Sequence, residues 1–249
     1  MRKPTFFLLV ICVHLLTTAR TIIALEPAAA SFAVVELFTS EGCSSCPPAD
    51  RVLAELADDA KKNGRRIYPL AFHVDYWNYL GWKDPFSLTD SSERQEQYGA
   101  ALRVKQSYTP QMIVNGNTEF IGSDGRRARK AVDAALALPA QAAVTLHATT
   151  DAGERKIEYQ VSGAPKNAVL CVAVVESGLV SQVRRGENAG RALSHTNVVR
   201  KFVTLPLDAS TGSVGLESEF SSPKRDLQVI AFLQDRHTMA IFGAAAIHL

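Results

Sequence analysis

The chain has 249 residues, of which 47% are hydrophobic and 21% are charged. This composition excludes disordered, collagen-like and low-complexity chains, and a formal net charge of +2 does not indicate a nucleic-acid-binding protein. Four cysteines are too few for a disulfide-rich scaffold, so any cysteine chemistry must depend on particular positions.

The N-terminus has the pattern of a signal peptide. A positively charged pair precedes the apolar run FFLLVICVHLL at residues 6–16, which is shorter than a membrane-spanning helix. We expect a signal peptide at residues 1–24, with cleavage after Ala24; Ala19 and Ala30 are alternative cleavage sites, and an uncleaved membrane anchor is the alternative reading of the segment.

Removal of this segment changes both the charge and the cysteine count. Arg2, Lys3 and Arg20 would be lost without any acidic residue, so the formal net charge would fall from +2 to −1. Cys12 would also be lost, which leaves three cysteines in a compartment where disulfides form. The sequence therefore predicts a periplasmic or secreted protein that has no membrane contact after cleavage.

Residues 32–138 alternate between strand and helix patterns. The predicted elements are a strand at 32–38, a helix at 49–63, a strand at 66–74, a helix at 93–106 that Ser91 or Ser92 caps, a hairpin at 111–122 and a helix at 126–138. Pro69 favours an edge position for the second strand, since proline cannot donate a backbone hydrogen bond. This β-α-β-α-β-β-α order predicts an α/β domain with a mixed sheet covered by helices.

The pattern changes after Pro139. Six strand-like runs follow, separated by Gly, Ser, Asn and Pro: QAAVTLHATT, RKIEYQVSG, AVLCVAVVES, NVVRKFVTL, DLQVIAFLQD and HTMAIFGAAAI. We therefore expect a second, all-β domain at residues 140–249, with a sandwich-like arrangement.

The motif Cys43-Ser-Ser-Cys46 lies between the first strand and the first helix. Two thiols at this spacing can close a small disulfide, and the helix N-terminus stabilises a thiolate. Because the first cysteine is usually the more exposed, we expect Cys43 to attack a partner and Cys46 to resolve the mixed disulfide. The alternatives are half of a zinc site, for which the sequence offers no second half, and a purely structural disulfide.

Two prolines follow the motif directly. Pro47-Pro48 suits a first helical turn, so the helix is expected to begin at Pro47 with Ser45 or Cys46 as its cap. Cys43 would then lie outside the first turn, which predicts a less acidic nucleophile than strong oxidases possess.

Thr109-Pro110 stands directly before the hairpin strand MIVNG. With the strand, CSSC, helix, strand and helix before it, and the hairpin and final helix that follow, the segment 32–138 resembles the thioredoxin superfamily. The resemblance implies that Pro110 is a cis-proline that packs against the CxxC, and that Thr109 and Pro110 offer backbone to a bound substrate. A trans proline that opens a strand is the alternative.

Glu36 interrupts the apolar strand AVVELF, seven residues before Cys43. The superfamily resemblance implies that such an acid lies beneath the disulfide and accepts the proton of Cys46. The alternative is a strand-end carboxylate that faces solvent or an arginine.

Four segments extend the resemblance along the chain: VVELFTSEGCSSCPPAD, AFHVDYWNYLGWKDPF, YTPQMIVNG and GENAGRALSHTNVVR. They resemble the DUF1223 family, a group of exported, thioredoxin-like proteins with an added C-terminal domain and no firmly assigned function. The resemblance implies this fold and export; for activity it implies only redox chemistry.

Other candidate residues carry weaker signals. His73 ends the second strand, where it is either a core histidine, a proton shuttle, or a Cu(I) ligand together with the two cysteines of the motif. The aromatic-rich segment 76–82 is a peptide-binding rim, a lid or part of the core. Cys171 lies in an apolar strand and is expected to be buried. The long segment 177–196 is either a functional loop or a solvated one.

The sequence thus favours an exported thiol–disulfide oxidoreductase. Its partner would be a protein thiol or disulfide, or a redox partner, and it needs neither a cofactor nor a metal ion. One alternative is a periplasmic copper-binding module that uses the same cysteines. The other is a non-catalytic interaction protein in which the CxxC disulfide is structural.

Overall fold

The computed structural model describes residues 30–151, 154–217, 220 and 225–249. The predicted signal peptide at 1–24 lies outside the described residues. Among the helices of the described part of the chain, none has the length and apolar character needed to cross a membrane.

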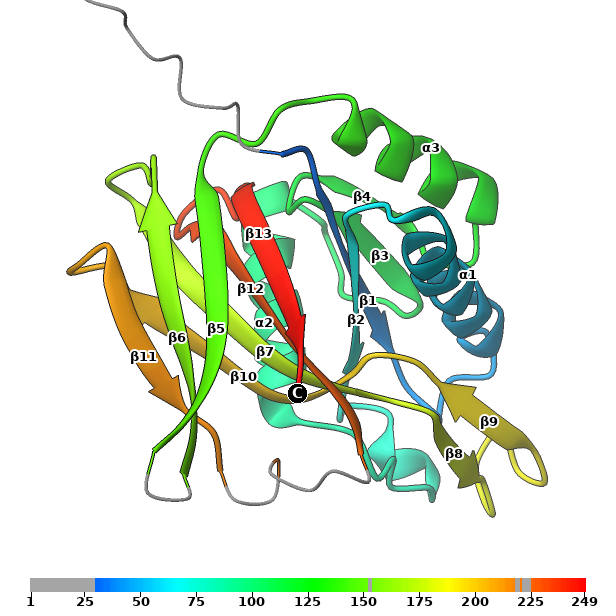
Figure 1. Ribbon diagram of the computed structural model, residues 1–249. Helices are drawn as coiled ribbons and strands as arrows, with labels where there is room; N and C mark the ends of the chain where they lie inside the picture. Colours follow the sequence, from blue (N-terminus) through cyan, green and yellow to red (C-terminus); the bar gives the residue numbers. More distant parts are fainter. Residues whose placement is uncertain (1–29, 152–153, 218–219, 221–224) are drawn as a thin grey trace, which may run out of the picture.

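A single eight-stranded sheet runs through the molecule, in the order β13-β12-β7-β10-β2-β1-β3-β4 (Figure 1). In chain order its strands are β1 (Ala33–Thr39), β2 (Ile67–His73), β3 (Gln111–Val114), β4 (Thr118–Ile121), β7 (Ala168–Ser177), β10 (Val198–Pro206), β12 (Asp226–Asp235) and β13 (Ile241–His248). β1 and β2 are parallel, whereas β3 is antiparallel to β1 and β4 to β3. The predicted mixed α/β class is therefore confirmed.

Helices cover both faces of the β1–β4 end of this sheet. They are α1 (Pro47–Asn63), α2 (Thr89–Leu102) and α3 (Gly125–Leu136), with a short 3₁₀ helix η1 (Asn78–Leu80) before α2. Because successive side chains of a strand point to opposite faces, Val35 and Leu37 of β1 pack with α1 and α3. Val34 and Phe38 point the other way and pack with Tyr98 of α2.

The C-terminal part adds a second layer of strands, and it also continues the N-terminal sheet. β5 (Ala143–Asp151), β6 (Glu154–Ser162) and β11 (Thr211–Gly215) make a three-stranded sheet that packs on β7 and β12. The expected separate sandwich is wrong in one respect: β7, β10, β12 and β13 continue the N-terminal sheet, through the parallel pair of Val198 in β10 with Ala71 in β2. The division into domains 32–138 and 140–249 stays a prediction.

The position of Pro69 also differs from the expectation. β2 is an inner strand, and Pro69 lies on the side where β2 meets β10 through one bridge only. Because β10 does not pair with β2 at Pro69, the N–H that proline lacks would have had no strand partner there. Asn197 Nδ2 donates to the Pro69 carbonyl at 2.9 Å and the Asn197 carbonyl accepts from Ala71 N at 2.9 Å, so one residue satisfies both groups.

The ends of the helices agree with the sequence in one case and differ in another. α1 begins at Pro47 as predicted, and Gly64 ends it with a left-handed φ of 63°. α2 begins at Thr89 after the extended residue Leu88, so Ser91 and Ser92 lie inside its first turn and neither is the cap. Ser92 instead donates its hydroxyl to Asp75 at 2.6 Å.

Three short strands were not predicted. β8 (Leu179–Gln182) and β9 (Ala192–His195) form a two-stranded hairpin within the segment predicted as a long loop, and β11 lies in the three-stranded sheet. The predicted hairpin at 111–122 is present; Val114 pairs with Thr118, so three residues connect its strands, with positive φ at Asn115 (47°) and Gly116 (72°).

Candidate functional site

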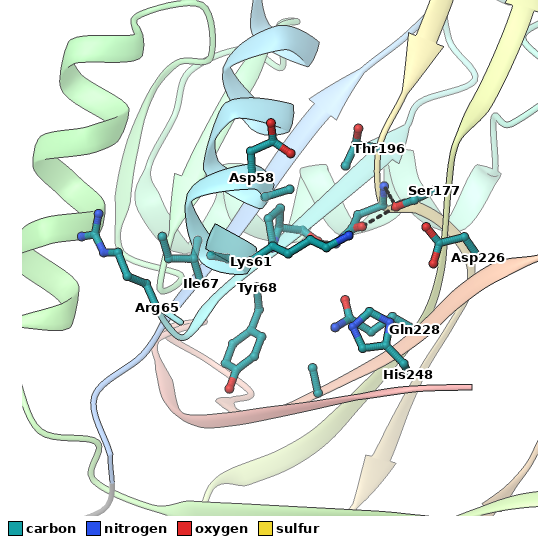
Figure 2. A pocket seen from close by; sticks show the side chains of 15 residues that line it. Asp58, Lys61, Arg65, Ile67, Tyr68, Ser177, Thr196, Asp226, Gln228 and His248 are labelled. Atoms are coloured by element: carbon teal, nitrogen blue, oxygen red, sulfur yellow. Dashed lines mark hydrogen bonds between the residues drawn. The ribbon is translucent and has the colours of Figure 1, made fainter. Parts of the chain in front are cut away.

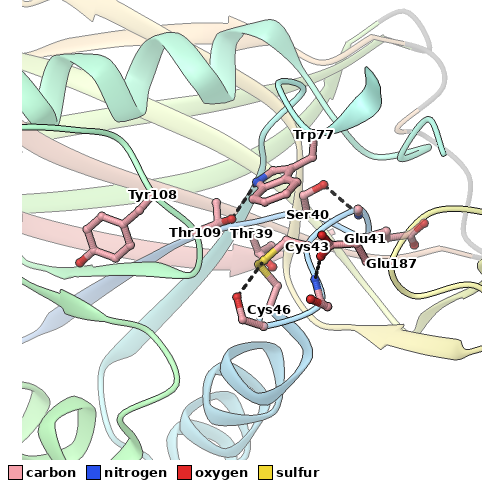
Figure 3. Close-up of a disulfide and its surroundings, with 12 residues drawn as sticks. Thr39, Ser40, Glu41, Cys43, Cys46, Trp77, Tyr108, Thr109 and Glu187 are labelled. Atoms are coloured by element: carbon pink, nitrogen blue, oxygen red, sulfur yellow. Dashed lines mark hydrogen bonds between the residues drawn. A yellow bond between two sulfur atoms is a disulfide. The ribbon is translucent and has the colours of Figure 1, made fainter. Parts of the chain in front are cut away.

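Cys43 and Cys46 form a disulfide that joins the loop after β1 to the N-terminus of α1 (Figure 3). Their Cα atoms are 5.4 Å apart, and Cys46 is the N-terminal cap residue with helical dihedral angles. Cys43 lies before this cap, so the first-turn N–H groups of α1 do not surround it.

Both cysteines are buried. Cys43 is 1% exposed and Cys46 is 0% exposed, while Ser44 and Ser45 between them are exposed. The two cysteines thus hardly differ in exposure, and the assignment of Cys43 as the attacking residue stays a prediction. A macromolecular substrate would reach the sulfur atoms only if this loop moved.

Thr109 and Pro110 lie at the same end of the sheet as the disulfide. Gln111, the next residue, pairs with Phe38 near the end of β1, just before the disulfide loop begins. The Thr109–Pro110 peptide bond is cis. Trp77 Nε1 donates to Thr109 Oγ1 at 2.8 Å, and Figure 3 shows the indole between this threonine and the disulfide loop. The structure thus brings these two predicted substrate-binding residues to the cysteines.

Glu36 lies on the opposite face of β1. Its neighbours Val35 and Leu37 face α1, so the Glu36 side chain points toward α2, where it is fully buried. Arg94 Nη2 donates to Glu36 Oε1 at 3.0 Å, and the Tyr98 hydroxyl donates to the same oxygen. The structure does not bring Glu36 to Cys46, and the alternative of a carboxylate paired with an arginine describes it better.

Asp50 is a carboxyl group on the disulfide side of the sheet. It lies in the first turn of α1, is partly buried, and accepts a hydrogen bond from Thr39 Oγ1 at 2.9 Å. Burial raises the pKa of Asp50 above its ordinary value, although the charges of His73 and His195 and the bond from Thr39 oppose the rise.

His73 is buried at the end of β2, and one of its two ring nitrogens has a hydrogen-bond partner among the described residues. Its Nδ1 lies 2.7 Å from Asp84 Oδ2, whereas no described residue gives a hydrogen-bond partner to its Nε2. Burial lowers the pKa of His73, but the charge of Asp84 and the hydrogen bond outweigh it, so the net shift is upward. Asp84 is shifted oppositely: burial raises its pKa, and the charge of His73 and the hydrogen bonds it accepts bring the net pKa below the ordinary value.

A second buried histidine lies against the first. The rings of His73 and His195 have centroids 4.8 Å apart in a T-shaped arrangement, and Phe86 packs on both. His195 Nε2 lies 2.9 Å from Glu41 Oε1, and Trp82 Nε1 donates to Glu41 Oε2 at 2.7 Å. Two acid–histidine pairs are thus buried directly behind the disulfide loop.

Side chains of the loop between β8 and β9 form hydrogen bonds with the backbone of the disulfide loop. Asn188, which is fully buried, donates its Nδ2 to the carbonyls of Glu41 at 2.8 Å and Cys43 at 3.0 Å. Glu187 accepts a hydrogen bond from Ser44 N at 3.0 Å. The segment 177–196, for which the sequence allows a functional or a solvated loop, therefore contributes directly to the geometry around the CxxC motif.

Sequence reasoning missed several of these groups. Asp84 and Glu41 lie in segments without periodicity, and Asn188 and His195 are distant in sequence from the cysteines. The signal that pointed to them was the likeness of whole segments to a family: VVELFTSEGCSSCPPAD contains Glu41, AFHVDYWNYLGWKDPF contains Asp84, and GENAGRALSHTNVVR contains Asn188 and His195. Spacing alone cannot reveal a contact that a loop makes across the fold.

The described residues offer two further observations on ligands. Within residues 30–151 and the other described ranges, no group of three His, Cys, Asp or Glu side chains is arranged to hold a metal ion. A polar cavity of about 520 Å³ opens between α1 and the β12–β13 pair, with Lys61, Tyr68 and His248 in its lining (Figure 2). The cavity is lined by the first residues of β2, whereas the disulfide lies beyond the opposite end of that strand. The cavity and the disulfide are therefore separate.

Comparisons with known proteins found a matching family model and a relative. A family model described as "Protein of unknown function (DUF1223)" matches residues 34–234. A thioredoxin from Methanocaldococcus jannaschii is 30% identical over 94 residues, which is 38% of this chain and 84% of that protein. Part of the chain is therefore related to thioredoxins.

Two solved structures are similar over most of the chain. Protein AGR_C_4864 from Agrobacterium tumefaciens superposes with a TM-score of 0.68 at 30% identity, covering 88% of this chain and 94% of that one. HBP35 of Porphyromonas gingivalis has a TM-score of 0.65 at 16% identity, over 90% of this chain and 77% of that one. The second likeness concerns the fold alone.

Proposed function

The chain belongs to the DUF1223 family, and from this premise we propose that it is a thioredoxin-like thiol–disulfide oxidoreductase. Cys43 attacks the sulfur of a partner, Cys46 resolves the mixed disulfide, and Thr109 and Pro110 contact the backbone of the bound substrate. The substrate class is a protein thiol or disulfide, and the reaction needs no organic cofactor.

One observation carries this proposal. The Cys43–Cys46 disulfide closes at the N-terminus of α1, in the loop after the inner strand β1, and Thr109-Pro110 directly precedes the neighbouring strand β3 at the same end of the sheet. A dithiol in this position is next to the positive end of a helix, which stabilises the thiolate that exchange requires. The relation to a thioredoxin over 94 residues supports the same chemistry.

A second function is favoured by the burial of both cysteines. A disulfide whose residues are 1% and 0% exposed resembles a structural link, and the chain would then be an interaction protein without redox activity. We place this second because the exposed Ser44-Ser45 segment is short and its displacement would uncover Cys43.

We also propose that the protein acts after export, in the periplasm or outside the cell. The support is the signal-peptide pattern at residues 1–24 and the presence of a disulfide, which persists in oxidising compartments.

Equilibration of the full chain with mixtures of reduced and oxidised glutathione, and with mixtures of reduced and oxidised dithiothreitol for the more negative potentials, separates the two functions. For a catalytic pair we expect a reduction potential less negative than about −300 mV, with reversible conversion between dithiol and disulfide. A disulfide that stays oxidised at potentials well below about −300 mV would support the structural role and contradict the oxidoreductase.

A further inference from the structure

The loop between β8 and β9, residues 183–191, lies directly against the CxxC motif (Figure 3). Glu187 accepts a hydrogen bond from Ser44 N at 3.0 Å, and Asn188 donates to the Cys43 carbonyl at 3.0 Å. Since the two serines of the motif are its exposed residues, a protein that approaches the disulfide meets this loop as well. The exposed side chains of the loop therefore belong to the surface that a substrate would contact.

The backbone of this loop is fixed by its own hydrogen bonds. Val183 N donates to the Arg191 carbonyl at 3.0 Å, and Gly190 N donates to the Val183 carbonyl at 2.8 Å. Val183 is buried, and Gly186 lies against the segment after η1, since a Cβ at this glycine would be 3.4 Å from Trp82 Cβ. The loop thus presents its exposed side chains from a defined position beside the motif.

The exposed charges around the motif are mostly positive. Two segments contribute them: the disulfide loop with the start of α1 (residues 40–52), and the β8–β9 loop with the adjoining strand residues (181–194). Their exposed charged side chains are Arg51, Arg184, Arg185, Arg191 and Glu187. The formal net charge expected for the chain after loss of residues 1–24 is only −1, so this positive charge is a local property of the surface.

Three of these side chains are not used within the fold. Glu187 and Arg191 form hydrogen bonds with the motif and within the loop. For Arg51, Arg184 and Arg185, no hydrogen-bond or ion-pair partner lies among the described residues. A guanidinium group presents its N–H donors in a planar fork that matches a carboxylate, so three unpaired arginines favour a ligand that carries carboxylates.

Exposed apolar side chains lie on the elements that flank the loop. Tyr79 in η1 is 79% exposed, and Val180 in β8 is 63% exposed. The loop contacts η1, since a Cβ at Gly186 would lie 3.7 Å from the Leu80 carbonyl. Aromatic and arginine side chains are enriched at protein–protein interfaces, so this combination favours a protein segment over a small anion as the ligand.

We propose that Arg51, Arg184 and Arg185 form a docking surface for an acidic segment of the protein substrate. This inference rests on the proposed function, and it narrows the substrate class to protein thiols or disulfides that have Asp or Glu near the reacting cysteine. Carboxylates of the segment pair with the guanidinium groups while the reacting sulfur lies at the CxxC motif. Attraction of this kind acts mainly on the rate of encounter, and it weakens as salt is added.

The test uses two disulfide-linked peptide dimers of equal length, whose cystine is flanked by glutamates in one and by lysines in the other. The reduced full chain is mixed with each dimer, and the release of peptide thiols is followed. In this reaction the CxxC pair gives two electrons and two protons to the dimer, whose S–S bond breaks as the Cys43–Cys46 bond forms. Each rate is divided by the rate with dithiothreitol, an uncharged dithiol, which removes the difference in intrinsic reactivity between the dimers.

For the wild-type chain we expect the acidic dimer to react about tenfold faster than the basic one at about 0.01 M ionic strength. The difference should nearly vanish at about 1 M salt, where the Debye length is about 3 Å. Arg184→Glu/Arg185→Glu changes exposed side chains only and should reverse the preference at low salt.

A control variant separates the docking surface from the net charge of the chain. Lys130 and Lys166 are exposed, as the two arginines are. Lys130 lines a groove together with Val114, whose partner Val35 lies near the start of β1, whereas the disulfide follows the end of β1. Lys166 precedes β7, and the opposite end of β7 leads to β8. Lys130→Glu/Lys166→Glu should therefore keep the preference of the wild type.

The results that would overturn the inference differ from those that would overturn the proposed function. If the wild-type chain reduces both dimers at equal normalised rates, or if Arg184→Glu/Arg185→Glu keeps the wild-type preference, the docking surface is wrong while the proposed function stands. A preference that the lysine variant loses as fully as the arginine variant would also contradict a local surface. If the reduced wild-type chain reacts with neither dimer, the proposed function fails and the inference fails with it.

Discussion

His195 Nε2 and Glu41 Oε1 lie 2.9 Å apart although 154 residues separate them in the chain. Glu41 belongs to the disulfide loop, and His195 ends β9 in the C-terminal part. The C-terminal part therefore contacts the loop that carries the CxxC motif. The loop between β8 and β9 supplies Asn188, whose side-chain amide donates a hydrogen bond to the carbonyl of Cys43.

We expect Asn188→Ala to loosen the disulfide loop. The substitution removes the donor described for the buried Glu41 carbonyl and one of the two donors of the Cys43 carbonyl, which also accepts from Cys46 N at 3.2 Å; this should lower the free energy of unfolding by about 1–3 kcal/mol. Reduction of the disulfide by dithiothreitol should become several-fold faster because Cys43 becomes exposed. Asn117→Ala, at an exposed position of the β3–β4 turn, is the matched control. An unchanged reduction rate in Asn188→Ala would show that this amide does not restrain the loop.

The Glu36–Arg94 pair should stabilise the fold without affecting exchange. Arg94 is buried beneath aromatic rings, including Phe202 at 4.5 Å, so loss of its carboxylate leaves a buried charge. Glu36→Ala should therefore lower the free energy of unfolding by about 3–5 kcal/mol in denaturant titrations. The double variant Glu36→Leu/Arg94→Met should regain most of this loss. A Glu36→Gln chain whose exchange has an altered pH profile would restore the rejected role of Glu36.

Stability should depend on pH through the Asp84–His73 pair. The pKa of Asp84 is lowered, so its contribution is present above the ordinary value of 3.8 and is lost as the pH falls through the folded value. The pKa of His73 is raised, so its contribution is complete below the ordinary value of 6.5 and is lost as the pH rises through the folded value. Unfolding free energy should thus decline above pH 6.5, and His73→Gln should flatten that decline. An equal slope in both chains would contradict the assignment.

Cys43 should be a moderately acidic thiol. α1 begins at Pro47, so Cys43 lies outside the first turn, where the effect of the helix N-terminus is strongest. Alkylation of the reduced chain, followed as a function of pH, should give an apparent pKa well above that of strong oxidants. The prediction is wrong if this pKa lies near about 4.

The sequence predicted the N-terminal elements well because their signals are local. The apolar run of β1, the prolines that begin α1, Gly64 that ends it and the Asn115-Gly116 turn each act within a few residues. The continuation of the sheet from β2 to β10 was not predicted, because strand pairing over more than a hundred residues leaves no local period.

The candidate site was predictable only in part, for the same reason. The CxxC motif and Thr109-Pro110 follow from order and spacing, and the structure brings them together. Glu36 was misassigned because a strand pattern reveals that a residue is buried but not which face it occupies. Asp84 and Asn188 lie in irregular segments, where only the folded chain shows what their polar side chains contact.

The most direct test of the oxidoreductase proposal is covalent trapping. The full chain with Cys46→Ala cannot resolve a mixed disulfide, so expressed in its own cells it should accumulate reductant-sensitive adducts through Cys43 with protein partners. The adducts should be absent from the double variant Cys43→Ala/Cys46→Ala. If the Cys46→Ala chain is folded and exported but forms no adduct beyond the double variant under oxidising or reducing growth, the disulfide is structural and the proposed activity is wrong.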